Sequence, residues 1–358
     1  MSEFFKDLKV VELAAVLAGP SAGMFFAELG AEVIKVENKP AGGDATREWR
    51  LPGETKDGPS AYFCSVNWGK THLFLDLRDS ADRDRLYSEI ADADIVLTNY
   101  RAETAAKLGV GYADLAALNE NLIFIGLDGF EHSDKAAYDV VLQAETGWIS
   151  MTGTDPALPA KLPVALIDIL AGHQIKEAAL LALLKRAKTG RGSEVKCSLE
   201  KSSLAALANQ ATNYLMCGHV AGPAGTLHPN IAPYGDAFLT ADGRRLVLAV
   251  GSNAQFEKLC TVLEISEIST DPRFATNTAR VTHRSGLQEI LAKAFEKMQA
   301  QEAESKLSAE GIPYGMVRAL DEVLESPTAA AMRLRDVQEG REAARLSGLA
   351  FTTDFLRT

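Results

Sequence analysis

Short apolar runs alternate with amphipathic segments over the first 200 residues of the chain. Runs rich in Val, Ile and Leu that are bounded by polar turns predict buried β-strands, because a helix needs a longer stretch. The expected strands lie at residues 9–13, 32–37, 72–77, 94–99, 122–127 and 194–199.

The segments between those runs carry the signals of helices. Residues 80–93 place Leu86 and Ile90 on one face, with Ser80 as the expected N-cap. Residues 169–188 form the strongest helical pattern of the chain, and the Thr-Gly-Arg-Gly turn that follows is expected to end it. Two more helices are expected at residues 19–30 and 201–217.

This alternation of strands and helices predicts the fold class. Strands separated by helical segments indicate an α/β fold with a largely parallel sheet and helices on both of its faces. Because crossovers between parallel strands are right-handed, the expected arrangement is Rossmann-like.

The pattern changes at residues 218–233, where glycine and proline dominate and the periodicity disappears. We expect a domain boundary there, together with a functional loop whose flexible positions are Gly218, Gly222 and Gly225.

A different pattern follows that loop. Asp242-Gly243 lies between two short apolar runs and predicts a β-hairpin. Helical sequence continues to about residue 310, and a last short strand is expected at residues 311–317. This combination indicates a smaller α+β domain.

Composition fits a soluble globular protein, with 47% hydrophobic and 24% charged residues, and 358 residues suit two domains. No run reaches the roughly 18 apolar residues of a membrane span, and the first residues lack a signal-peptide pattern. The four cysteines are scattered, which favours reduced thiols and a cytoplasmic location. The net charge of −11 argues against a nucleic-acid partner, although a local basic cluster could still bind a phosphorylated ligand.

Several common catalytic motifs are missing from the sequence. It has no G-x-G-x-x-G after a strand, no P-loop and no G-x-S-x-G elbow, which argues against a dinucleotide-dependent dehydrogenase and an α/β-hydrolase. The six histidines lie far apart and have no metal-ligand spacing, so no metal site is expected.

Asp168 lies in the segment LPVALIDILAGHQ, at the start of the strongest helix. An aspartate at that position is usually a helix N-cap. The same position suits catalysis, because a helix N-terminus favours a charged carboxylate and the ordinary pKa of aspartate is about 3.9. Such a carboxylate attacks an activated acyl group without a general base.

The motifs around Asp168 resemble those of the class III CoA-transferases, the CaiB/BaiF family. The similar segments occur in the family's order over nearly the whole chain. They begin with LKVVELAAVLAGPSAGMFFAELGAEVIKVE and continue with SVNWGKTHLFLDLRD, DADIVLTNYRAETAAKLGVGY, AYDVVLQAETGWISMTG, LPVALIDILAGHQ and KTGRGSEVKCSLE.

The resemblance implies a domain arrangement and an oligomeric state. It implies a large Rossmann-like, CoA-binding domain of residues 1–217 and about 326–358, and a small domain of about 218–325. It also implies an interlocked homodimer with the active site between the large domain of one subunit and the small domain of the other.

The resemblance further implies the reaction and its residues. Coenzyme A moves from an acyl-CoA to a carboxylic acid through an anhydride and an aspartyl-CoA thioester on Asp168, with Tyr138 and Asp139 beside it and the glycine-rich loop as a mobile cover. Coenzyme A thioester is a substrate, and no tightly bound cofactor is expected. Lys70 and Lys107 are expected to contact phosphate, and Tyr100 to pack on adenine. The implied CoA-binding residues are Val16, Ala18, Lys35, Asn38, Asn67, Lys70, Asn99, Tyr100, Arg101 and Lys107.

Two other functions remain open from the sequence. An α-methylacyl-CoA racemase shares this fold, but the similar racemases carry a histidine where this chain has Tyr138, and a phenol is a poor base. A non-catalytic CoA-binding scaffold is the second alternative, and the presence of Asp168 within its motif argues against it.

Overall fold

The computed structural model describes residues 3–356 and divides into two compact units. The larger unit holds the described residues up to Ile149, then Lys161–Ala221 and the residues from Thr328 onward. The smaller unit holds Ser150–Ala160 and Gly222–Pro327. The described helices include none that is long and apolar enough to cross a membrane.

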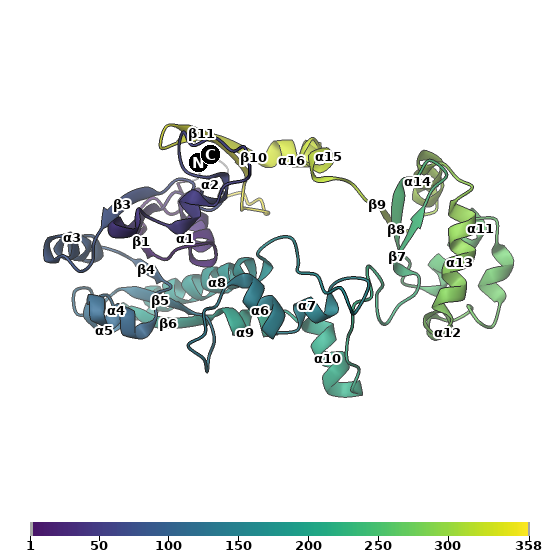
Figure 1. Ribbon diagram of the computed structural model, residues 1–358, viewed down its shortest axis with the longest axis horizontal. Helices are drawn as coiled ribbons and strands as arrows, with labels where there is room; N and C mark the ends of the chain where they lie inside the picture. The colour runs from purple at the N-terminus through teal and green to yellow at the C-terminus, as the bar shows by residue number, and fades with distance from the viewer. Residues whose placement is uncertain (1–2, 357–358) are drawn as a thin grey trace. The chain divides into compact units, whose positions relative to one another are not determined.

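A six-stranded parallel sheet forms the centre of the larger unit (Figure 1). Its order is β3-β2-β1-β4-β5-β6, and every neighbouring pair is parallel. This order is that of a Rossmann fold, and it confirms the expected parallel α/β arrangement. The strands are β1 (Lys9–Leu13), β2 (Glu32–Asn38), β3 (Thr71–Leu75), β4 (Ile95–Thr98), β5 (Ile123–Asp128) and β6 (Ser193–Ser198).

Helices cover both faces of this sheet. One face packs its apolar side chains against α1, α6, α8 and α9, and the other packs against α3, α4 and α5. Because both faces are buried, the strands carry the continuous apolar runs seen in the sequence. The helices are α1 (Ala18–Glu28), α2 (Ala61–Cys64), α3 (Ser80–Ile90), α4 (Ala102–Leu108), α5 (Tyr112–Ala116), α6 (Asp139–Glu145), α8 (Leu166–Thr189), α9 (Leu199–Ala205) and α10 (Ala208–Cys217), with the 3-10 turns η1 (Lys39–Ala41) and η2 (Ala45–Glu48).

Three details of the expected helices are wrong. Asp79, rather than Ser80, caps α3, because its carboxylate accepts from the N–H groups at the helix start. The helix expected at residues 169–188 begins at Leu166, so Asp168 lies in its first turn and is not its N-cap. The single helix expected at residues 201–217 is interrupted, because Ala208, the first residue of α10, adopts a φ of +45°.

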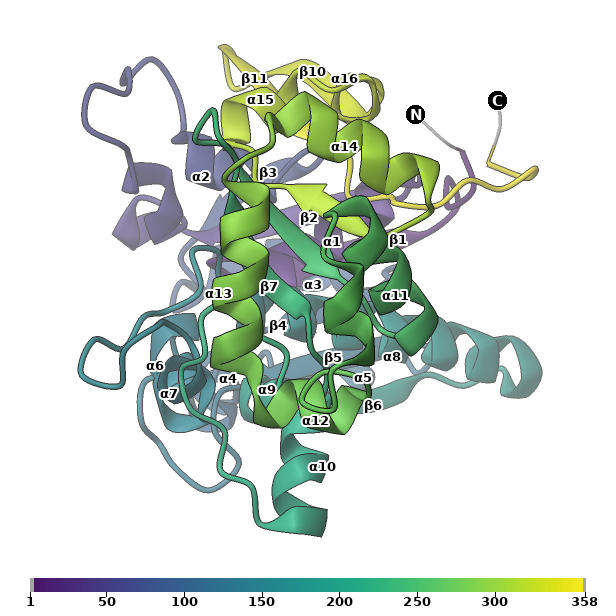
Figure 2. The ribbon, with the colours of Figure 1, turned by 90° about the vertical axis from the view of Figure 1, so that its right-hand side faces the viewer.

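The smaller unit contains an antiparallel sheet and its own hydrophobic core. The hairpin expected at Asp242-Gly243 joins β7 (Tyr234–Leu239) to β8 (Arg245–Ala249), and β9 (Tyr314–Met316) pairs with β8. In Figure 2 these elements are drawn in green, with α13 beside β7. The helices are α11 (Asn253–Val262), η3 (Ser266–Thr270), α12 (Asn277–Thr282), α13 (Arg284–Phe295), α14 (Ala300–Ala309) and α15 (Leu320–Leu324).

The chain passes between the units at four points, and two of these lie in α7 (Trp148–Met151) and α16 (Pro327–Met332). After α16 it forms an antiparallel hairpin of β10 (Arg333–Gln338) and β11 (Arg341–Leu346), which the sequence did not reveal. Ion pairs join the hairpin to the N-terminal half of the larger unit: Arg345 with the buried Glu28, Arg341 with Glu54, and Glu339 with Arg47. The last described segment of the larger unit is therefore part of its core structure.

Candidate functional site

The strand order reverses between β1 and β4, and ligands bind to open α/β sheets at the carboxyl ends of the strands at such a point. The loop from β1 to α1, residues 14–17, lies there. The side chain of Asn99, which directly follows β4, pairs with both backbone groups of Ala15: its Oδ1 accepts from Ala15 N at 3.2 Å, and its Nδ2 donates to Ala15 O at 3.0 Å. The loop is therefore fixed to the neighbouring strand.

Val16 occupies an unusual conformation in this loop, with a φ of +74°. A β-branched residue rarely adopts the left-handed region, so the surrounding structure must hold it there. The N–H of Val16 donates to Oδ2 of Asp44 at 3.1 Å. Strained residues of this kind concentrate at functional sites, which marks the loop as a candidate.

A buried network of charges lies beneath the loop. Lys35 donates to Glu12 at 2.9 Å, contacts Asp44 Oδ2 at 3.1 Å and donates to the Ala14 carbonyl at 2.7 Å. Lys70 donates to the second oxygen of Glu12 at 2.7 Å. Burial opposes the charge on Lys35, yet the carboxylates of Glu12 and Asp44 raise its pKa. Burial of Lys70, in contrast, lowers its pKa to about 8.

A second part of the network extends from Glu37. Its carboxylate accepts from Arg47 at 2.6 and 2.7 Å, from His72 at 2.8 Å and from the N–H of Asp44 at 2.8 Å. Although burial opposes it, the hydrogen bonds from Arg47 and His72 hold the pKa of Glu37 well below its usual range. Charges within otherwise apolar strands were the sequence signal for this network, because Glu12 and Lys35 are paired in register on β1 and β2.

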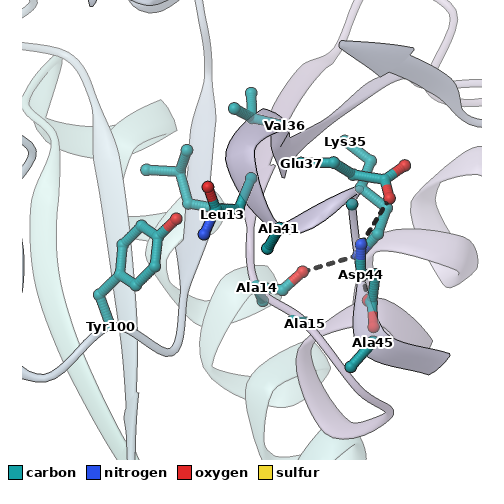
Figure 3. Close-up of a pocket in the computed structure, with 12 residues that line it drawn as sticks. Leu13, Ala14, Ala15, Lys35, Val36, Glu37, Ala41, Asp44, Ala45 and Tyr100 are labelled. Carbon is teal, nitrogen blue, oxygen red and sulfur yellow. Dashed lines mark hydrogen bonds and ion pairs between the residues drawn. The ribbon is translucent and has the colours of Figure 1, made fainter. Parts of the chain in front are cut away.

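A cavity of about 200 Å³ opens at the carboxyl ends of β1 and β2 (Figure 3). Figure 3 shows Tyr100 across the cavity from Glu37 and Asp44. Burial raises the pKa of Tyr100, so its phenol stays neutral and its ring is available for packing. Three of the residues expected to bind coenzyme A line this cavity: Lys35, Asn38 and Tyr100.

The expected phosphate contact is wrong for Lys70. Its side chain has no exposed surface, and its ammonium donates to Glu12, to the Pro20 carbonyl at 2.9 Å and to Asn67 Oδ1 at 2.9 Å. All three donor positions are thus used inside the protein. Asn67 is itself buried and donates to the Phe63 carbonyl. The ammonium of Lys35 is equally buried. By contrast, Arg101, which directly precedes α4, and Lys107, which lies on α4, are both exposed.

Asp168 lies beside the same loop. Gly172, one turn further along α8, packs directly on α1: a Cβ on it would lie 2.2 Å from Ser21 Oγ and 3.1 Å from the Ala18 carbonyl oxygen. Lys176, another turn on, lies over the ring of Phe25. The two helices therefore run in the same direction, and the first turn of α8 lies toward the loop that precedes α1.

The environment of Asp168 differs from the one expected. Asp168 is 7% exposed, and its carboxylate accepts no hydrogen bond from the described residues. Burial, with a smaller contribution from the charge of Asp139, raises the pKa of Asp168 to about 7. Burial therefore opposes the ionised carboxylate that was expected at this helix N-terminus.

Asp139 provides the side-chain cap of α8 that was expected from Asp168. Its Oδ1 accepts from the N–H of Ile167 at 2.8 Å, and its Oδ2 accepts from Gln143 Nε2 at 2.6 Å. Gln143 in turn accepts from the N–H of Leu162, just before α8. The first residue of α6 thus fixes the first turn of α8. The preceding residue, Tyr138, is 56% exposed and available to a ligand.

Tyr62, which the sequence did not single out, lies near the same carboxylates. Burial raises the pKa of Tyr62 to about 12, and the negative charges of Asp168, Asp139 and Asp44 contribute. Its ring packs edge-on against Trp49 at 5.1 Å. Tyr62 lies on α2, far from Asp168 in sequence, so only the fold brings it to the site.

The glycine-rich loop is divided between the two units. Gly218 ends α10 in the left-handed conformation, in the larger unit. Gly225 belongs to the smaller unit, where its N–H donates to the Gly153 carbonyl at 2.7 Å. A Cβ on Gly222 would meet no neighbouring atom. The role of this loop as a cover stays a prediction.

Comparison with known proteins points to one family. The family model described as CoA-transferase family III matches residues 5–357. The succinate–glutarate CoA-transferase of Agrobacterium fabrum is 36% identical over 96% of this chain and 87% of its own length. The succinyl-CoA:glutarate CoA-transferase of Mus musculus is 35% identical over 89% of this chain and 73% of its own length. A solved CaiB/BaiF family protein from Brucella suis is 35% identical, covers 97% of this chain and 92% of its own, and has a TM-score of 0.83.

Proposed function

The chain belongs to CoA-transferase family III, and on that basis we propose that it moves coenzyme A between carboxylic acids through covalent intermediates on Asp168. CoA transfer from a thioester is the activity of this family, so the chain is an enzyme and not a silent scaffold. The intermediates, the site residues and the acids exchanged are the proposal.

The proposed reaction is a series of four acyl exchanges. A carboxylate oxygen of Asp168 attacks the acyl carbon of the donor thioester, and the C–S bond breaks to release CoA thiolate. The thiolate attacks the aspartyl carbon of the resulting anhydride, which releases the donor acid and leaves an aspartyl-CoA thioester. The acceptor carboxylate displaces the thiolate to form a second anhydride, and the thiolate then takes the new acyl group and restores Asp168.

The carboxylate of Asp168 carries this proposal, because its surroundings suit acyl transfer. Burial of Asp168, which is 7% exposed, limits the access of the water that would hydrolyse an anhydride. A carboxylate with a pKa of about 7 is a stronger nucleophile than an ordinary aspartate once it is ionised. Each exchange needs donors for an oxyanion, and the N–H groups of Ala18 and Gly19 are available: both residues are buried in the first turn of α1, and neither N–H has an acceptor within the described residues.

Coenzyme A is proposed to bind at the carboxyl ends of β1, β2 and β4. Tyr100 supplies an aromatic face to the cavity, and Asn38 supplies an amide at its edge. Arg101 and Lys107 are exposed cations near the end of β4 and suit the phosphates. Val16 and Ala18 remain in the proposed site for their backbone groups, and Asn99 remains because it fixes the loop. We propose that the buried side chains of Lys35, Asn67 and Lys70 stabilise the site without contacting coenzyme A.

We also propose that the protein forms the interlocked homodimer of its family. The surface of α10 supports this proposal: none of its residues is buried, and Tyr214, Leu215 and Met216 are between 57 and 79% exposed. A helix with several large exposed apolar side chains is typical of a protein interface. Light scattering should give twice the chain mass of 38.4 kDa, and the change of Leu215 and Met216 to lysine should lower it.

The acids exchanged are proposed to be dicarboxylic, because the relatives from A. fabrum and M. musculus are named as succinate–glutarate and succinyl-CoA:glutarate CoA-transferases. The test is a panel of succinyl-CoA and acetyl-CoA donors against dicarboxylic and monocarboxylic acceptors of matched length. Chromatography of the CoA esters identifies each product. Transfer only between monocarboxylic acids would contradict this part of the proposal.

The covalent mechanism is tested on Asp168 itself. Enzyme incubated with succinyl-CoA and quenched with hydroxylamine or borohydride should yield a modified Asp168 peptide in mass spectrometry. Asp168→Ala should lose the modification and the activity, whereas Asp84→Asn on the exposed face of α3 should keep both. Activity that survives Asp168→Ala without any modified peptide would refute the mechanism. Incorporation of deuterium from the solvent at the substrate α-carbon, without transfer of coenzyme A, would instead indicate a racemase.

A further inference from the structure

Asp44 is the residue on which the loop between β1 and α1 depends most. Its side chain is 1% exposed, and both of its oxygens are occupied. Oδ1 accepts from the N–H and the hydroxyl of Thr46 at 3.0 and 2.8 Å. Oδ2 faces the N–H of Val16 and the ammonium of Lys35, each at 3.1 Å. Its backbone N–H donates to Glu37 at 2.8 Å.

These contacts connect the strained backbone of Val16 to a buried group of side chains with equal numbers of negative and positive charges. The left-handed φ of Val16 costs about 1–3 kcal/mol of conformational free energy, so a compensating contact must exist. Asp44 and Glu12 oppose Lys35 and Lys70 in one enclosed group of two negative and two positive side chains. Lys70 also donates to the carbonyl of Pro20 in the first turn of α1. The group therefore contacts the loop on one side and the helix that follows it on the other.

We propose that Asp44 is a positioning residue of the transferase, whose carboxylate holds Val16 in the left-handed conformation and so aims the first N–H groups of α1 at the reacting acyl group. The inference rests on the proposed function, because it assigns a purpose to the loop beside Asp168. In this role Asp44 acts through the backbone of Val16, although it also lies at the cavity proposed for coenzyme A. Nothing in its sequence position suggests it, because η2 begins immediately after it and a capping role would suffice.

The substitution Asp44→Asn isolates the proposed contact. The side chain keeps its shape and one acceptor, but an amide NH2 replaces one carboxylate oxygen. With that NH2 at the place of Oδ2, it faces two donors, the Val16 N–H and the Lys35 ammonium, and it releases the loop. With the amide turned the other way, it faces the N–H of Thr46. In the second orientation an oxygen still faces Val16, but it is neutral and a weaker acceptor than the carboxylate. Both orientations therefore weaken the contact with Val16, and kcat/KM is expected to fall by about 100-fold.

The substitution Val16→Gly separates positioning from plain structural support. Glycine adopts positive φ without strain, so the loop then needs Asp44 less. In a double-mutant cycle of Val16→Gly and Asp44→Asn, the loss caused by Asp44→Asn should be at least about 10-fold smaller in the Val16→Gly background than in the wild-type background. The decrease should lie mainly in kcat for the acyl transfer. Equal losses in both backgrounds would overturn the proposal, since a purely structural role of Asp44 does not depend on the side chain at position 16.

A milder variant covers the case in which Asp44→Asn does not fold. Thr46→Val removes one hydrogen bond to Asp44 without changing the charge or the shape of the buried group. We expect a decrease in kcat of about 5-fold in the wild-type background and no decrease in the Val16→Gly background.

A crystal structure of the Asp44→Asn protein should show Val16 at a negative φ, and an unchanged φ of about +74° would contradict the proposal. Failure of the covalent mechanism is recognised separately, because it requires activity in Asp168→Ala.

Discussion

The carboxylate of Asp139 accepts a hydrogen bond of 2.8 Å from the backbone N–H of Ile167, the residue that precedes Asp168. The first turn of α8 is thus capped by a residue 28 positions earlier in the chain. Asp139 satisfies a helix donor and places a fixed negative charge near Asp168, and both effects bear on the nucleophile.

The pH dependence of transfer should therefore respond to Asp139. The nucleophile is the ionised form of Asp168, so kcat/KM should fall as the pH drops below about 7. Asp139→Asn keeps an acceptor for Ile167 but removes the charge, so the pKa of Asp168 should decrease and the rising limb should move to lower pH. Because burial is the larger cause of the raised pKa of Asp168, the midpoint of the rising limb should stay above about pH 4, the ordinary pKa of aspartate. Rates measured from about pH 5 to 9 test this, and an unmoved limb would show that the charge of Asp139 is irrelevant.

Asp168 should also lower the stability of the protein at neutral pH. Its folded pKa is about 7 and its unfolded pKa about 4, so the folded state retains the proton longer and stability decreases as the pH rises from about 4 to 7. Asp168→Asn lacks this decrease. It should exceed the wild type by up to about 4 kcal/mol in unfolding free energy near pH 8 and match it near pH 4. Urea unfolding at both pH values measures the difference, and Asp84→Asn should show none.

The lysines of the predicted CoA site should separate into two classes. Lys70→Met leaves Glu12 buried with one cation fewer, which should cost about 3–5 kcal/mol of stability. Lys107→Met changes an exposed side chain and should raise KM for the acyl-CoA several-fold without a change in the free energy of unfolding. Urea unfolding and steady-state kinetics on the two variants distinguish the roles. A raised KM with normal stability in Lys70→Met would restore the phosphate contact expected from the sequence.

The C-terminal hairpin should depend on one ion pair. Arg345→Ala leaves the carboxylate of Glu28, whose side chain is 3% exposed, without its cation. We expect a loss of about 3 kcal/mol and protease cleavage within residues 333–346. Arg335, an exposed arginine of the same hairpin that pairs in register with Ala344, provides the matched control as Arg335→Ala. Equal protease resistance of both variants would show that the hairpin is held by its other contacts.

The sequence predicted the sheet of the larger unit because its strands are buried on both faces and stand out as apolar runs. It placed the start of α8 at residue 169 because Asp168 resembled an N-cap, whereas the helix begins at Leu166 without a local capping side chain. The cap comes from Asp139, and long-range pairing of this kind leaves no local signal. The same reason explains why Asp44 and Tyr62 were missed and why Lys70 was assigned to phosphate, since its carboxylate partner lies on β1.

The C-terminal hairpin also determines the order in which the protein can be completed on the ribosome. The smaller unit, Gly222–Pro327, emerges before β10 and β11 have been synthesised. Until they appear, Glu28, Glu54 and Arg47 lack the partners that the hairpin supplies, so the larger unit is still incomplete when the smaller unit folds. A nascent chain arrested before residue 333 should therefore be recognised by chaperones that bind exposed apolar surface, and release from them should follow translation of the last strand.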